Sequence, residues 1–240
     1  MSVFVEMIGG ELYIMNDDYY QLYYNTLTTM YNIAKENNIP FSASLISNLL
    51  LDTDHLQKFI NLYQKVTNQG ISVEIVTSFD LWGRFKSEEA LNQWWNNFQK
   101  LGEVMTTRPQ VEMVLSKPSI DLYMQDADIP EMKVFNQILE HPEKYMFFFE
   151  NYVPNNPENI KHVPSNEEKI NLHKKLIDKY SDKLDFLQAY VTRDIDVDIE
   201  LYDTIKQIAE FRINSLEKEK ELLKRVGSNK SGYWKIIDEK

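Results

Sequence analysis

The chain has 240 residues, of which 43% are hydrophobic and 26% are charged, a composition typical of a folded globular protein. Its formal net charge of −11 opposes binding to nucleic-acid phosphates, so we expect no nucleic-acid partner. The sequence contains no cysteine, which excludes disulfides, cysteine nucleophiles, thiolate zinc sites and iron–sulfur ligation by this chain itself.

The sequence shows neither a membrane-spanning segment nor an export signal. No apolar run approaches the ~18 residues of a membrane-spanning helix. The first residues carry neither a basic segment nor a signal-peptide cleavage site. We therefore expect no membrane association and a cytoplasmic location.

Short β-rich runs alternate with longer segments of helical period along the chain. Apolar residues recur at i, i+3, i+4 and i+7 in residues 20–34, 56–66 and 91–101, which predicts three amphipathic helices. Ser165 and Glu168 form a capping box and predict a further helix start. Strands are predicted at residues 3–8, 41–46, 72–77, 111–115, 145–149 and 186–191.

The spacing of these strands predicts the fold class. Strand starts lie ~30–40 residues apart, about the length of a βαβ unit, which indicates parallel strands joined by right-handed helical crossovers. The class is therefore α/β, and an open doubly wound sheet and a partial (β/α) barrel both fit this order. In either fold, a ligand binds at the carboxyl ends of the strands.

Two regions are expected. Residues 1–198 form the domain of alternating strands and helices, and residues 199–240 form a C-terminal helix and tail. The helix is expected to begin near Glu200 and to end near Arg225, before Gly227. The strand at residues 3–8 is expected to be an open edge of the sheet, which favours aggregation unless a partner or the C-terminal helix covers it.

Compact polar groups follow the first three predicted strands. Gly9, Gly10 and Glu11 follow the first; Ser47 and Asn48 follow the second; Ser78 and Asp80 stand at the end of the third. Paired glycines allow a close approach of the backbone to a ligand. Hydroxyl, amide and carboxylate groups at one sheet edge are suited to binding an amino acid and a ribose.

Together these elements resemble the second, third and fourth β/α units of the radical S-adenosylmethionine superfamily, over residues 1 to about 180. The resemblance implies a partial parallel (β/α) barrel of TIM-like type with a C-terminal helical extension, and S-adenosylmethionine as cofactor. It implies cofactor contacts by the residues matching the family's strand ends, namely Gly9, Gly10, Glu11, Ser47, Asn48, Ser78 and Asp80. By the same resemblance, Arg84 pairs with the carboxylate of the cofactor.

The chain departs from this family in one essential respect. Members hold an iron–sulfur cluster with three cysteines spaced CxxxCxxC, and this sequence has none; Met1 stands two residues before the first strand. An iron–sulfur cluster is therefore expected only if a partner supplies the cysteines. The expected partners are a separate CxxxCxxC-bearing chain or a substrate protein or peptide. Three explanations remain open: the chain is one part of a split enzyme, it is a truncated product, or it retains the barrel for another use. The sequence specifies neither a reaction nor a substrate.

Each of these residues also has a structural interpretation. The paired glycines suit a tight turn, and Ser47, Asn48, Ser78 and Asp80 suit helix caps or turns. A second functional hypothesis is a non-catalytic α/β protein that binds a ligand or a partner. A third hypothesis is an unrelated enzyme that uses Glu11 and Asp80 as an acid–base pair. The histidines show no HxH or HExxH spacing, so no metal site is expected.

Overall fold

The computed structural model describes residues 2–7, 17–180, 223–226 and 233–236. In this part of the chain, five parallel strands form one sheet in the order β1-β2-β3-β4-β5. Each strand lies close to its predicted position, and the α/β class is confirmed. The strands are β1 (Val3–Met7), β2 (Phe41–Ile46), β3 (Ser72–Phe79), β4 (Gln110–Leu115) and β5 (Met146–Asn151).

Helices connect the strands, and the predicted periodic segments are confirmed. The capping box also forms: the Glu168 backbone N–H donates to Ser165 Oγ at 3.2 Å, and the Ser165 N–H donates to Glu168 Oε2 at 2.8 Å. The helices are α1 (Asp17–Glu36), α2 (Thr53–Thr67), α3 (Glu88–Val104), α4 (Lys117–Met124), α5 (Pro130–Glu140), the 3₁₀ helix η2 (Pro157–His162) and α6 (Asn166–Tyr180).

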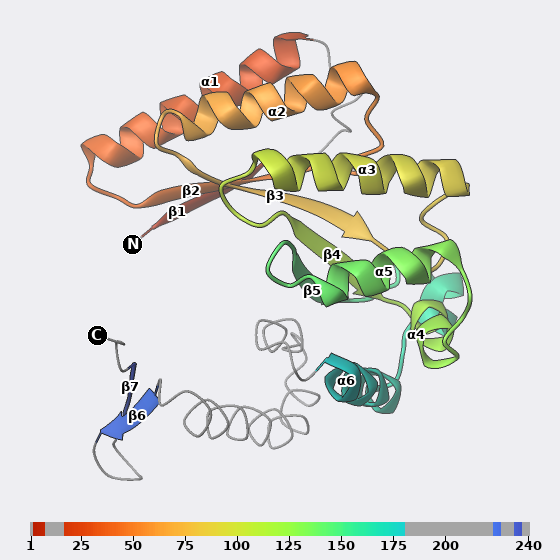
Figure 1. The fold of residues 1–240 in the computed structure, drawn as a ribbon. Helices are drawn as coiled ribbons and strands as arrows, with labels where there is room; N and C mark the ends of the chain where they lie inside the picture. The colour runs from red at the N-terminus through yellow and green to blue at the C-terminus, as the bar shows by residue number, and fades with distance from the viewer. Residues whose placement is uncertain (1, 8–16, 181–222, 227–232, 237–240) are drawn as a thin grey trace.

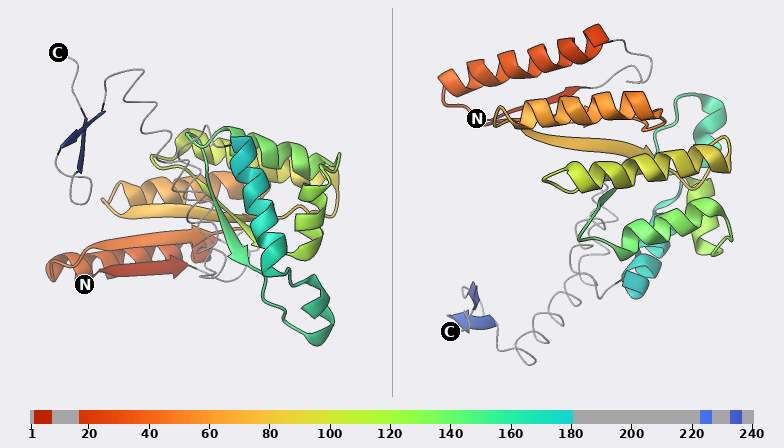
Figure 2. Two further views of the ribbon diagram at one scale, coloured as in Figure 1. Left: turned by 90° about the horizontal axis from the view of Figure 1, so that it is seen from below. Right: turned by 45° about the horizontal axis from the view of Figure 1, so that its top comes forward.

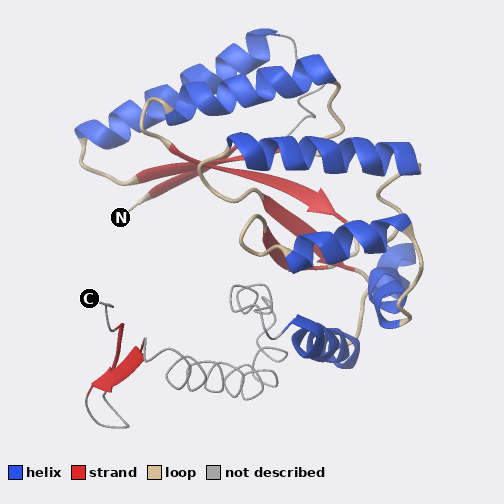
Figure 3. Ribbon diagram, in the orientation of Figure 1, coloured by secondary structure: helices blue, strands red, loops and turns tan. Residues whose placement is uncertain are grey.

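The strand order decides where the helices lie. Because each strand lies beside the strand before it in the chain, right-handed crossovers place the connecting helices on the same face of the sheet. Figures 1 and 3 show α1, α2, α3 and α5 on one side of the strands. At one end of this arrangement lie β1 and α1 (Figure 2), so the prediction that the first strand is an edge is confirmed.

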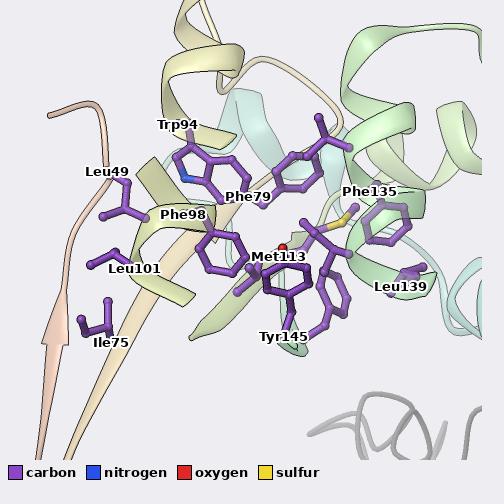
Figure 4. Packing of buried hydrophobic residues seen from close by; sticks show 14 of the residues in the cluster. Leu49, Ile75, Phe79, Trp94, Phe98, Leu101, Met113, Phe135, Leu139 and Tyr145 are labelled. Atoms are coloured by element: carbon purple, nitrogen blue, oxygen red, sulfur yellow. The ribbon is translucent and has the colours of Figure 1, made fainter. Parts of the chain in front are cut away.

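The core lies between the sheet and these helices. Alternate strand residues such as Ile75, Phe79 and Met113 point to this side and are buried, and they meet apolar residues of the helices (Figure 4). The Trp94 ring of α3 lies 5.3 Å from that of Phe79, and the Phe135 ring of α5 lies 6.1 Å from it on stacked planes. Aromatic packing therefore joins α3 and α5 to the middle of the sheet.

One expectation about the C-terminal region is wrong. Residues Leu223–Val226 form strand β6, which pairs antiparallel with β7 (Tyr233–Ile236), so no helix ends at Arg225. The aromatic and β-branched residues of these two strands favour β structure. The predicted strand at 186–191 and the start of the predicted helix near Glu200 lie outside the described residues.

Candidate functional site

The loop after β2 carries two of the predicted site residues, and both make local turns. The Leu49 N–H donates to Ser47 Oγ at 3.0 Å, and the Leu50 N–H donates to Asn48 Oδ1 at 2.7 Å. These side chains therefore perform the turn-forming role that the structural interpretation gives them. Leu49 has a φ of 55°, in the left-handed region that is strained for a branched residue.

Helix α3 holds this loop in place with a side chain that is not among the predicted site residues. Asn97 is 6% exposed, and its amide donates to the carbonyl of Leu49 at 2.9 Å and to that of Leu51 at 2.7 Å. Gln93 donates to the same Leu51 carbonyl at 2.9 Å. The signal was present in the sequence, because Asn97 interrupts the apolar stripe of α3 three residues after Trp94.

Asp80, immediately after β3, is a partly buried acidic group of the predicted site. Its carboxylate accepts hydrogen bonds from Ser119 Oγ and from the backbone N–H of Trp82, the latter at 3.3 Å. Burial raises the pKa of the Asp80 carboxyl, and the hydrogen bond from Ser119, those from backbone N–H groups and the charge of Arg84 oppose this rise. Asp80 thereby joins the loop after β3 to the start of α4.

The start of α4 adds two serines that are not among the predicted site residues. Ser116 caps the helix by accepting from the Ser119 N–H, and the Ser116 and Ser119 hydroxyls lie 2.9 Å apart. Both side chains are buried. Ser116, directly after a strand and before Lys117-Pro118, is a recognisable cap signal. The contact between Ser119 and Asp80 spans 39 residues and has no local signature.

The predicted residues gather at the carboxyl ends of β2 and β3. Ser78 stands between the buried Thr77 and Phe79 of β3 and points to the face opposite the helices, which we call the inner face. Ser47, Asn48 and Asp80 lie in the loops that follow the two strands. The register pairs Ile46 with Val76, so these loops begin at the same carboxyl edge of the sheet.

The inner face is acidic. The five strands contain no lysine, arginine or histidine, and four of them place one glutamate on this face. Glu112 is the register partner of Ser78, so it lies beside the predicted residues. The sequence-based prediction did not include these carboxylates, although each of the four apolar strands visibly contains one glutamate. The four residues are Glu6, Glu74, Glu112 and Glu150.

Five of the eight predicted site residues lie at or after the carboxyl ends of the neighbouring strands β2 and β3: Ser47, Asn48, Ser78, Asp80 and Arg84. Gly9, Gly10 and Glu11 lie outside the described residues. That all eight line one pocket stays a prediction.

The chemistry of these groups discriminates between cofactors. Carboxylate, hydroxyl and amide oxygens suit an ammonium group and ribose hydroxyls. They do not suit an iron–sulfur cluster, which needs thiolates that this sequence lacks. Within residues 2–7, 17–180 and the β6–β7 strands, no cluster of three or more His, Asp or Glu side chains has the arrangement of a metal site.

Comparisons with known proteins give no match to any family model, curated protein or solved structure. Among the helices that the structure describes, none is both long and apolar enough to span a bilayer.

Proposed function

We propose that this chain binds S-adenosylmethionine at the carboxyl edge of its sheet and acts as part of a radical S-adenosylmethionine-type enzyme. The observation that carries the proposal is the placement of Asn48, Ser78 and Asp80 at one carboxyl edge of adjacent parallel strands. The acidic inner face supports it, because the cofactor carries positive charge on its ammonium and sulfonium groups.

The same proposal includes an incomplete parallel (β/α) barrel. A sheet whose order follows the chain, with α1, α2, α3 and α5 on one side, has the arrangement of successive barrel units. Residues 1–198 would form this unit, with residues 199–240 as its extension.

In this proposal the residues have distinct tasks. Glu11 accepts a hydrogen bond from the cofactor's ammonium group, and Arg84 faces its carboxylate. Asp80, already fixed by Ser119, accepts from a ribose hydroxyl. Cysteine thiolates of a second chain would hold the iron–sulfur cluster of such enzymes, and no residue of this chain replaces them.

Calorimetry on the full chain tests the proposal. S-adenosylmethionine should bind, and Glu11→Gln should weaken binding by about 10-fold to 100-fold, as expected for the loss of a charged hydrogen bond. Glu36→Gln, on the exposed end of α1, is the matched control and should bind as the wild type does. Absence of binding at millimolar cofactor, or equal effects of the two substitutions, would refute the proposal.

The alternative is a non-catalytic α/β protein that binds a ligand or a partner, which the absence of cysteine favours. S-adenosylhomocysteine and adenosine show in the same titration which part of the ligand is recognised. Recognition of the amino-acid part predicts binding of S-adenosylhomocysteine but weak or no binding of adenosine alone.

A further inference from the structure

The outer side of β1 offers backbone hydrogen-bonding groups to another strand. The Val3 N–H donates to the Pro40 carbonyl at 2.8 Å, so the backbone groups of Val3 face β2, and those of Phe4 and Glu6 face away. No strand in the described residues pairs with this side. The strand contains neither proline nor lysine, the residues that commonly protect an edge.

Helix α1 has an exposed apolar stripe above the same edge. Its buried side carries Tyr20, Leu27 and Ala34. Leu22, Met30 and Ile33 are 54%, 38% and 56% exposed, and positions i, i+8 and i+11 lie within about 80° of one another around a helix.

The stripe does not lie on the side of α1 that meets α2. Helix α2 approaches α1 at Asp17, whose carboxylate pairs with Lys58 at 2.9 Å, and at Gln21 and Tyr24. Leu22 and Ile33 therefore lie on the opposite flank, where α1 has no helical neighbour among the described residues. The apolar side chains of Val5 and Met7, beneath that flank, are only partly buried.

These two observations point to one kind of occupant. A strand alone would form hydrogen bonds with the outer backbone groups of β1 but would leave the apolar stripe of α1 exposed. A helix alone would cover the stripe but would leave those backbone groups unpaired. A β-strand followed by an amphipathic helix covers both, because a right-handed crossover puts the helix on the α1 side of a strand parallel to β1.

We propose that the β1–α1 edge docks a β/α unit of a second polypeptide, with its strand parallel to β1 and its helix on Leu22, Met30 and Ile33. This inference deepens the proposed function, since it assigns the surface for the chain that would supply the cysteines. It does not depend on cofactor binding by this chain.

Charge favours a different protein over a second copy. Asp18 and Glu36 lie at the two ends of the stripe, four residues before Leu22 and three after Ile33, and therefore on the same side of α1. Antiparallel packing of two α1 helices would bring Asp18 of one copy near Glu36 of the other, and each copy carries a charge of −11. The docking helix is therefore expected to be basic at its ends.

Photocrosslinking of the full chain in its native host tests the docking surface. p-Benzoylphenylalanine replaces Leu22, Ile33 or Phe4 in separate variants, and Ile160, which is 60% exposed on η2, in the control. The Leu22 and Ile33 variants should attach to one helix of a single protein. The Phe4 variant should attach to the strand immediately before that helix, and the Ile160 variant should not capture this protein.

A variant that places charge in the stripe tests the same surface with the probe at Phe4 alone. Leu22→Lys with Ile33→Lys should reduce the adduct from the Phe4 position by about 10-fold or more, because both apolar contacts are lost. The exposed pair Val153→Lys with Ile160→Lys is the control and should leave the adduct unchanged. Circular dichroism of each variant confirms that the fold is retained.

Other outcomes overturn the inference. An adduct of two copies of this chain identifies a homodimer, and a crosslink to residues 181–222 identifies an internal contact. Attachment of the probes to different proteins, or no adduct above the Ile160 control, also refutes it. Calorimetry with S-adenosylmethionine reports on the proposed function separately, so either idea can fail alone.

Discussion

Replacing Asn97 by alanine should loosen the loop that carries Asn48. The Asn97 amide is the side-chain donor to two backbone carbonyls in this loop, those of Leu49 and Leu51, and it is buried. The Leu51 carbonyl keeps a second donor, Gln93. The Leu49 carbonyl accepts no other hydrogen bond from the described residues, so alanine would leave it buried and unsatisfied.

The size of the effect follows from these contacts. Each lost hydrogen bond is worth about 0.5–1.5 kcal/mol, and an unsatisfied buried carbonyl costs about 1–3 kcal/mol. We expect Asn97→Ala to lower the free energy of unfolding by about 2–3 kcal/mol. Asn97→Asp should cost more, because it places a carboxylate against two carbonyl oxygens.

Urea denaturation monitored by tryptophan fluorescence measures this change, since Trp94 is fully buried in the core. Asn96→Ala, on the exposed side of α3, is the matched control and should change stability by less than about 0.5 kcal/mol. Equal stability of Asn97→Ala and Asn96→Ala would refute the role given to Asn97. The loop after β2, which carries Asn48, should become less ordered when Asn97 is lost. Asn97→Ala should therefore weaken binding of S-adenosylmethionine more than Asn96→Ala does.

Two further predictions concern buried polar groups. The pKa of Asp80 is raised in the folded protein, so the stability that this group contributes is present at low pH and is lost as pH rises through its folded pKa. Asp80→Asn removes this titration. Urea unfolding should therefore show the variant gaining stability relative to the wild type as pH rises above about 4, the ordinary pKa of an aspartic acid. A constant or falling difference would contradict the prediction. Thr77→Val removes the acceptor that Trp94 Nε1 reaches at 3.0 Å, and should cost about 1–3 kcal/mol in the same assay. A double-mutant cycle with Trp94→Phe should show coupling, and additive effects would argue against the hydrogen bond.

The regular elements were predictable because their signals are local. One short stretch of sequence contains the whole pattern of a strand such as Ser72–Phe79 or of an amphipathic helix such as α3. The spacing of the strands then predicts that they pair in parallel. The hairpin of β6 and β7 was missed because Lys224 and Arg225 fit the end of a charged helix as well as an exposed strand.

The candidate site was predictable only in part. Strand ends can be read from the sequence, so Ser78 and Asp80 were placed at the correct edge. The partner of Asp80 could not be predicted, because Ser119 comes from the next β/α connection and no periodicity links the two positions. Ser47 and Asn48 make local turns, and nothing in the sequence around them distinguishes a turn-forming side chain from one that contacts a ligand.

The strand order also has a consequence for how this sheet is assembled. Every pairing joins a strand to the one synthesised just before it, across about 30–40 residues, from Val3 with Phe41 to Gln110 with Met146. The entropy lost in closing each of these loops is therefore nearly the same, and no pairing waits for a distant segment. The sheet can thus grow one strand at a time as the chain leaves the ribosome, each new strand covering the edge that the previous one exposed.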